Sequence, residues 1–314
     1  MKIGIIRTDR GPCLAAFYGE RWVSVPEALR ALGETPVNEL SEFIGTYCDR
    51  IPALNRQILD LLDSGAAEAY TFPTAGAQYL PPLPASPVLF TARGNSALHT
   101  RTRKLPLCKQ PVMEQRYNFN LAGHDHTYVV RDGFTGCGWN YEMVVVMGKP
   151  CHGVCKEQAE DYIFGYTNML EFAGGEKNPF FDRWSMPDEE KVFADYAYAD
   201  CFNGNTRTPT PLGPYITTKD EVGDPHDQLF EERESGRLVS LGSAKAVIFT
   251  INEMVAYASG FMTLRPGDCF STASITYDAY QNFPGRYPDN AYIQVKTEKL
   301  GCLRLRIRDE RTEV

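Results

Sequence analysis

The amino-acid sequence predicts an α+β fold in which a small α/β domain precedes a larger domain built mainly of β-strands. Strand-like segments dominate the later part of the chain, and the helical segments there separate distant strands, which favours α+β over a doubly wound parallel sheet. A proline-rich segment, residues 72–87, is unsuited to helix or strand. We therefore expect residues 1–80 to form the N-terminal domain and residues 81–314 the main domain.

The N-terminal domain is predicted to open with two short strands, residues 1–8 and 14–25, joined by turn chemistry at residues 9–12. Residues 26–35 and 50–64 are predicted to be helical. The second helix is indicated by apolar residues at helical spacing and by Gly65 as a stop signal. The N-terminal domain should therefore combine a small β unit with two helices.

The main domain should be richer in strands than in helices. Alternating or continuous apolar runs predict strands at residues 88–94, 127–132, 141–148, 213–218, 238–244 and 269–277. Helices are predicted at residues 156–166 and 246–261. No internal repeat and no glycine-rich phosphate loop occurs in the sequence.

Composition excludes several classes of function. The chain has 314 residues, 43% hydrophobic and 23% charged, which is typical of a globular protein. Its net charge of −8 and the lack of a basic run argue against a nucleic-acid partner. No apolar stretch approaches the roughly 20 residues of a membrane-spanning helix, and the N-terminus does not resemble a signal peptide. We expect a cytoplasmic protein with no membrane partner.

The nine cysteines lie singly along the chain, without the paired spacing of a zinc site or a disulfide framework. Cys151, His152 and Cys155 are close together, but no second cluster accompanies them, so a loop and helix start is the preferred interpretation. His124 and His126 are also close, and a turn is again preferred to a metal pair.

Glu142 is the most informative acidic residue. It stands just before the apolar run at residues 143–147, which ends in the turn residues 148–150. A carboxylate at a buried strand must be hydrogen-bonded, paired or bound to a cation. A hard divalent ion with oxygen ligands is one solution, and a solvated position at the rim of the sheet is the alternative.

Several motifs follow one another over about residues 80–308. They are PPLPASPVLFTARGNSALH, PVMEQRYNFNLAGHDHTYVV, EMVVVMGKP, AEDYIFGYT, PTPLGPYITTKDEVGDPHD, MTLRPGDCFSTAS and LGCLRLRI. In this order they resemble the fumarylacetoacetate hydrolase family. The resemblance implies a mixed β-sandwich roll and a homodimer. It also implies Mg²⁺ or Mn²⁺ that chelates a 2-oxo acid or β-dicarbonyl substrate and stabilises its enolate.

The resemblance places the metal ligands at Asn140, Glu142 and Glu171. Asn140 stands where the family has an acid, and Glu171 stands where an Asp is usual. An amide oxygen still suits a hard cation, but the ligand set loses one negative charge. We therefore expect weakened metal binding.

The resemblance also places the proton-transfer residue at His99, with Thr102 where the family has the partner Glu. Thr102 cannot act as a carboxylate, although its hydroxyl can contact substrate. Without the resemblance, a loop position with a local hydrogen bond would be the preferred interpretation of His99. Arg116, where Lys is usual, could bind a substrate carboxylate bidentately, the alternative being a solvated Arg. Ser274 is the candidate hydroxyl, or else part of an ordinary strand end.

The resemblance, with these residues, implies an enzyme that acts through an enolate, and carbon–carbon bond cleavage is the preferred reaction. An isomerase, dehydratase or cyclase is the second, because losing the partner acid would suit proton movement without water attack. A binding protein that retains only the fold is the third. The aromatic-rich residues 180–202 could line a substrate pocket or pack at a dimer interface.

Overall fold

The computed structural model confirms the α+β class. It describes residues 1–83, 88–102, 104, 106–116, 120–132, 134–176, 209–273 and 286–312, and at positions 99, 102, 116, 134–138 and 172–176 it describes the backbone alone. Strands far outnumber helices in this part of the chain, and two β-sheets form the body of the protein.

The N-terminal part is a small helical and β unit. Its strands are β1 Lys2–Thr8, β2 Gly11–Tyr18, β3 Arg21–Ser24, β4 Thr71–Pro73 and β5 Gln78–Leu80. Its helices are α1 Val25–Ala31, α2 Leu40–Tyr47 and α3 Ile51–Asp63, with the 3₁₀ turns η1 Cys48–Arg50 and η2 Glu68–Tyr70.

The rest of the chain supplies most of the β structure. The strands are β6 Leu89–Arg93, β7 Val112–Arg116, β8 Leu121–Ala122, β9 His126–Val130, β10 Phe134–Met147, β11 Ile163–Glu176, β12 Thr210–Thr218, β13 Leu229–Glu234, β14 Arg237–Ser243, β15 Cys269–Ser271, β16 Tyr292–Thr297 and β17 Gly301–Asp309. The helices are α4 Ala97–Thr102, α6 Lys219–Val222 and α7 Ile251–Ser259, with 3₁₀ turns η3 Ala159–Tyr162, η5 Pro225–Asp227 and η6 Ala244–Ala246.

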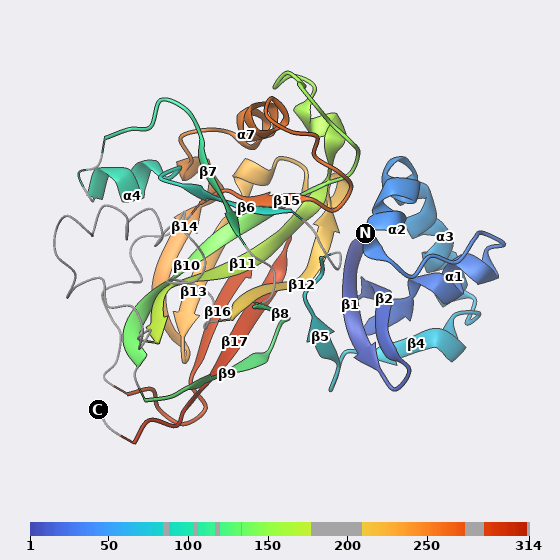
Figure 1. The fold of residues 1–314 in the computed structure, drawn as a ribbon. Helices are drawn as coiled ribbons and strands as arrows, with labels where there is room; N and C mark the ends of the chain where they lie inside the picture. Colours follow the sequence, from blue (N-terminus) through green and yellow to red (C-terminus); the bar gives the residue numbers. More distant parts are fainter. Residues whose placement is uncertain are drawn as a thin grey trace.

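The larger sheet has the strand order β4-β3-β2-β1-β12-β11-β10-β15-β6-β7, with β5 and β8 attached beside it. The smaller sheet has the order β14-β13-β16-β17-β9. Figure 1 shows the long strands β10 and β11 in the middle of the molecule, with β16 and β17 behind them and the N-terminal unit to one side. The pair β10–β11 is therefore an interior part of the larger sheet, with β12 on one side and β15 on the other.

One hydrophobic core fills the space between the two sheets. Alternate residues of β10, among them Tyr141, Met143 and Val145, are almost fully buried there. They pack in the same cluster as Ile293 and Leu303 of the smaller sheet. This face-to-face packing is the sandwich that the family resemblance implied.

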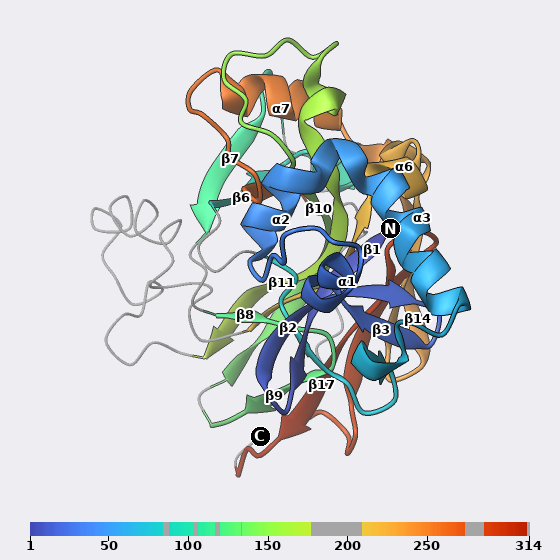
Figure 2. The ribbon, with the colours of Figure 1, turned by 90° about the vertical axis from the view of Figure 1, so that its right-hand side faces the viewer.

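A second core lies on the opposite face of the larger sheet. Val144 and Val146 of β10 and Met169 of β11 pack there with residues of the N-terminal helices, such as Phe43 and Leu54. Figure 2 views the protein from this side, with α2 and α3 toward the viewer. Strand β1 pairs with β12, so the N-terminal strands extend the main sheet. The division near residue 80 remains a prediction.

The structure contains most of the predicted strands and confirms helices near residues 26–35, 50–64 and 246–261. The last begins at Ile251, because Thr250 accepts from the backbone N–H of Glu253 in a capping box. The predicted strand at 269–277 is β15 over its first residues, and residues 274–277 lie outside the described part.

The prediction of a helix at residues 156–166 was wrong. The segment contains only the 3₁₀ turn η3, and β11 begins at Ile163. Burial on both faces removes the alternation that marks a strand, so the apolar spacing was misread as helical. Gly165 of β11 lies very close to the neighbouring strand β12, since a Cβ at this position would lie 2.3 Å from the carbonyl oxygen of Thr217.

Several further elements were not predicted, among them the strands β7, β13, β16 and β17. Two of the omissions, both in the N-terminal part, have a local cause. Residues 14–25 form a hairpin of β2 and β3 where one strand was expected, with Gly19 in the left-handed region at φ +63°. Helix α2 was missed because Gly45 in its middle lowers the helical propensity of the sequence. It is stabilised by burial of Phe43 and Ile44.

Candidate active site

The candidate site begins on the face of β10 that turns away from the sandwich core. Successive side chains of a strand point to opposite faces. Because Tyr141 and Met143 enter the sandwich core, Asn140 and Glu142 leave the sheet on the other face. Both are buried, with 3% and 1% of their surfaces exposed. The structure thus confirms a buried carboxylate on this strand, and the rim alternative for Glu142 was wrong.

Strand β11 adds the third predicted ligand to the same face. Asn140 is the direct partner of Glu171 in the antiparallel ladder, and Glu142 is the partner of Met169. Residues directly opposite in such a ladder share a face. Glu171 is also buried, with 3% exposed. The structure therefore brings Asn140, Glu142 and Glu171 together, although their roles as ligands remain a proposal.

The neighbouring strands extend this polar face. Ser271 of β15 pairs with Val144 of β10, so its side chain shares the face of Glu142. Leu89 of β6 packs in the second core with Val144, which places Thr91 and Arg93 on that face as well. The site is thus built from β6, β10, β11 and β15 rather than from loops.

Arg93 brings a positive charge to the acidic residues. Its Nη1 lies 3.9 Å from Oε1 of Glu171, and its side chain is 44% exposed. Its Nη2 donates a hydrogen bond to Oε1 of Glu114 on β7, and that oxygen also accepts from Oγ1 of Thr91 at 3.4 Å. Arg93 was missed by the sequence reasoning. No signal in the sequence marked it, because a charged residue at the end of a strand is ordinarily solvated.

The electrostatic surroundings keep Arg93 charged. Burial opposes its positive charge, but the carboxylates of Glu171, Glu114 and Glu142 outweigh this effect and raise the pKa of the guanidinium above its usual range. An Arg is in any case charged at every pH at which proteins fold. The site therefore holds a permanent cation beside two of the predicted metal ligands.

Asn95 fixes the corner between β6 and α4, the helix that carries His99 and Thr102. Its Nδ2 donates to the carbonyl oxygens of Phe249 and Thr272, each at 3.1 Å. Its Oδ1 accepts from the backbone N–H of Phe249 at 2.7 Å. Asn95 is 3% exposed. This buried amide ties the start of α4 to the segment before α7 and to the end of β15.

Several predicted site residues can be placed only in part. His99 and Thr102 lie in α4, and Arg116 ends β7 opposite Leu89. For these three the structure describes the backbone and not the side chain. Ser274 and the aromatic-rich residues 180–202 lie outside the described residues. Their predicted roles are therefore untested.

The donor set fits a hard divalent cation by its chemistry. Asn140, Glu142 and Glu171 offer only oxygen atoms, two carboxylates and one amide carbonyl, as Mg²⁺ and Mn²⁺ prefer. Within residues that the structure describes, no three His, Cys, Asp or Glu side chains are grouped as a metal site requires. Asn140 would thus be an essential third donor of the set.

The predicted turn at His124 is confirmed, since His124 and Asp125 form a turn before β9. Asp125 is bound by two arginines: its Oδ2 accepts from Nη2 of Arg304 at 2.6 Å and from Nη2 of Arg306 at 3.1 Å. Burial, reinforced by these arginines, lowers the pKa of His124 to about 4 despite the opposing charge of Asp125. His124 is therefore neutral near pH 7. The segment from Cys151 to Cys155 is a loop as predicted, but no α-helix starts after it.

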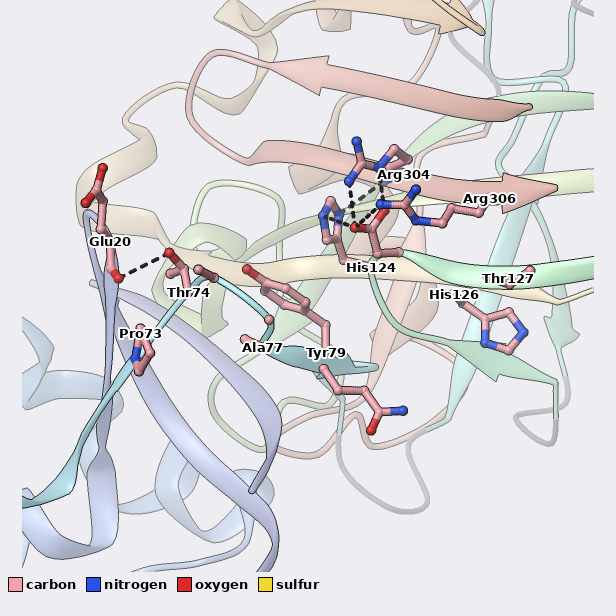
Figure 3. Close-up of a pocket in the computed structure, with 14 residues that line it drawn as sticks. Glu20, Pro73, Thr74, Ala77, Tyr79, His124, His126, Thr127, Arg304 and Arg306 are labelled. Atoms are coloured by element: carbon pink, nitrogen blue, oxygen red, sulfur yellow. Dashed lines mark hydrogen bonds and ion pairs between the residues drawn. The ribbon is translucent and has the colours of Figure 1, made fainter. Parts of the chain in front are cut away.

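His124, Asp125, Arg304 and Arg306 line a cavity of about 970 Å³. This cavity is separate from the acidic face, the sheet face that carries Glu142 and Glu171. Figure 3 shows Glu20 and Thr74 of the N-terminal part on one side, and His124, Arg304 and Arg306 on the other. Tyr79 packs edge-on against His124, with 4.8 Å between ring centroids. Because Asp125 engages both arginines, this cavity offers little free positive charge, and the acidic face remains the candidate site.

Comparisons with known proteins bear on this geometry. The family model described as Fumarylacetoacetate (FAA) hydrolase C-terminal matches residues 82–308. A relative from Burkholderia multivorans, described in general terms as a hydrolase, is 29% identical over 180 residues, which cover 57% of this chain and 58% of that relative. The match thus spans little more than half of the relative's length.

Solved structures share the fold over nearly the whole chain. A maleylpyruvate hydrolase from Sphingobium sp. SYK-6 is 20% identical, with a TM-score of 0.70 over 98% of this chain and 100% of that chain. Another structure of that hydrolase is a complex with manganese(II) ion and pyruvate. A 5-carboxymethyl-2-hydroxymuconate delta-isomerase from Mycobacterium smegmatis is 17% identical, with a TM-score of 0.64 over 99% of each chain.

Proposed function

The chain belongs to the fumarylacetoacetate hydrolase family, and from that premise we propose that it is an enzyme that cleaves a carbon–carbon bond in a 2-oxo acid or β-dicarbonyl substrate through an enolate. The observation that carries this proposal is the buried set of Asn140, Glu142 and Glu171 on one face of β10 and β11. Oxygen donors so arranged suit a cation that can stabilise an enolate.

Asn140, Glu142 and Glu171 would hold Mg²⁺ or Mn²⁺ in this proposal. When bound, the ion supplies Lewis-acid stabilisation of the negative charge that develops on the substrate's keto oxygen. The burial of the three side chains excludes bulk water and strengthens their electrostatic effect. The solved complex of the related fold with manganese(II) ion and pyruvate supports the choice of ion and substrate class.

His99 is proposed to take a proton at its imidazole from the attacking water. The water oxygen then bonds to the remote carbonyl carbon, and the carbon–carbon bond breaks with its electron pair passing into the enolate. Return of a proton to the enolate carbon completes the hydrolysis. Arg116, Ser274 and Thr102 are proposed to bind and orient the substrate, with Arg116 on its carboxylate.

A second candidate is isomerisation, because Thr102 replaces the acid that would assist His99 in activating water. Proton removal and return at carbon needs no attacking water, and a solved isomerase shares the fold. A dehydratase or cyclase would use the same enolate. A binding protein that retains the fold is the third candidate, and it would form no enolate.

One experiment separates these candidates. Purified protein with Mg²⁺, which is diamagnetic, is incubated in D₂O, first with pyruvate and then with a panel of acylpyruvates, and the reaction is followed by NMR. Deuterium exchange at C3 of pyruvate that is faster than in the same solution without protein would support an enolate site. Release of pyruvate from an acylpyruvate would support hydrolysis. Shifted double bonds without pyruvate would favour isomerisation. Absence of both exchange and turnover would contradict the enzyme proposal and favour a binding protein.

The proposed assembly is a homodimer, which the family resemblance implies. Phe261 and Met262 after α7 are 70% and 37% exposed, and they border an apolar hollow of about 220 Å³ with Met113 of β7. Such a surface suits coverage by a second copy. Sedimentation at micromolar concentration should give about twice 35.2 kDa. Across the described part of the chain, no helix is long and apolar enough to span a membrane.

A further inference from the structure

Arg93 lies close enough to the proposed metal ligands for its positive charge to interact with their carboxylates. It is the last residue of β6 and shares the sheet face of Asn140 and Glu142. Its Nη1 approaches Oε1 of Glu171 to 3.9 Å. A divalent ion held by the Glu171 carboxylate would therefore have the guanidinium as a close neighbour of like charge.

Glu114 holds the other end of the guanidinium. Nη2 of Arg93 donates to Oε1 of Glu114, and Oγ1 of Thr91 donates to the same oxygen at 3.4 Å. Glu114 is the direct partner of Thr91 between β7 and β6. The guanidinium therefore lies between two carboxylates, which favours its position beside Glu171 although 44% of the Arg93 side chain is exposed.

We propose that Arg93 is a built-in cation of this site, which neutralises part of the charge of Glu171 and thereby sets a low affinity for divalent metal. The inference rests on the proposed function, because it takes Glu171 as a metal ligand. Two positive charges close together in a buried site repel one another strongly, since the effective dielectric constant there is well below that of water. A bound ion must therefore compete with Arg93 for Glu171.

The inference distinguishes Arg93 from a residue that only supports the fold. A cation that competes with the metal weakens metal binding, so its removal must strengthen it. A side chain that merely orients Glu171 helps the metal, so its removal must weaken binding. The direction of the change therefore decides between the two roles, independently of any activity.

The test is calorimetric titration of the full chain with Mn²⁺, comparing the wild type with Arg93→Met and Arg93→Gln. Both variants should bind Mn²⁺ at least about tenfold more tightly, the effect expected from removing one nearby positive charge. Arg30→Met is the matched control, since Arg30 forms an exposed ion pair with Glu27 on α1, and its affinity should equal that of the wild type. Arg93→Gln retains an amide that can donate to Glu114, should the Met variant fail to fold.

Unchanged or weaker binding in the folded Arg93 variants would overturn the inference. Glu171→Gln separates this failure from failure of the proposed function. If Glu171→Gln weakens Mn²⁺ binding while the Arg93 variants leave it unchanged, the donor set stands and the role of Arg93 does not. If Mn²⁺ binds equally well to Glu171→Gln, the donor set itself is wrong, and the inference falls with it.

Discussion

Asn140 on β10 lies directly opposite Glu171 on β11, and each residue is 3% exposed. The two strands are each 14 residues long and adjacent in the larger sheet. Side chains that leave paired central strands are positioned more firmly than side chains on loops. The spacing of these two oxygen donors is therefore set by the backbone ladder.

Replacing Glu142 by Gln should weaken Mn²⁺ binding at least about tenfold, because the donor set would lose one of its two negative charges. Wild-type affinity is itself expected to be micromolar or weaker, since Asn140 replaces an acid. Calorimetric titration measures both values. Glu42→Gln on α2 is the control, because Glu42 is exposed. Submicromolar binding by the wild type would show that the loss of the acid has been offset.

Replacing Asn95 by Ala should lower the free energy of unfolding by about 2–4 kcal/mol, because it leaves several buried backbone groups at the β6–α4 corner without their partner. Urea unfolding measures this change. Turnover should fall as well, since α4 carries His99. Asn38→Ala, at an exposed position, is the control and should change neither quantity. A variant as stable as the wild type would mean that water replaces the amide at that corner.

The local pattern predicts β10 well, because its apolar run is long and ends in turn residues. The pattern fails for β11, whose first residues are buried on both faces and so show no strand period. The family resemblance nevertheless assigns Glu171 to the same ligand set as Asn140, because it counts residues from Gly165-Tyr166-Thr167, which lie within β11, rather than reading periodicity.

Contacts between residues far apart along the chain could not be predicted from local sequence patterns. Lys2 pairs with Thr217 between β1 and β12, and nothing local to either strand specifies a partner so distant along the chain. The meeting of Arg93 with Glu171 depends likewise on the order of β6, β15, β10 and β11 in the sheet. A charged residue at a strand end is ordinarily solvated, so its sequence position alone gave no reason to assign it to the site.

Stability should fall between pH 7 and pH 5 partly because of His124. Its pKa is about 4 in the folded protein and about 6.5 in an unfolded chain. Between about pH 6.5 and pH 4 the imidazole is protonated in the unfolded state and neutral in the folded state. The contribution of neutral His124 to the free energy of unfolding is therefore fully present above about pH 6.5 and is lost as the pH falls toward 4. At pH 5 the loss should be about 2 kcal/mol relative to pH 7.

Urea unfolding of His124→Asn at the two pH values tests this contribution. The Asn side chain can still accept the hydrogen bond that Nδ1 of His124 accepts from the backbone N–H of Arg304 at 3.2 Å, but it does not titrate. The variant should therefore lose about 2 kcal/mol less stability than the wild type on going from pH 7 to pH 5. His152→Gln at an exposed loop position is the control. Equal losses in His124→Asn and the wild type would exclude His124 as a source of the pH dependence.

Replacing His99 by Ala should lower turnover of a substrate by about 10² or more, the usual effect of losing a general base. Imidazole is the side chain best suited to exchange protons near neutral pH, and the proposed function assigns the role of general base to His99, which lies in α4. The thermal midpoint should stay nearly unchanged, which separates a chemical role from a structural one. Full activity of the variant would show that His99 does not accept a proton in the reaction.

Thr102→Glu is the companion variant, because it restores the acid that the motif lacks three residues after His99. A carboxylate there would stabilise the imidazolium that forms when water is activated. Hydrolysis of a simple acylpyruvate should then rise, and the double variant with His99→Ala should cancel the gain, because the acid acts through the imidazole. If Thr102→Glu changes nothing while Glu142→Gln abolishes metal binding, the altered ligand at Asn140 is the feature that separates this chain from its hydrolytic relatives.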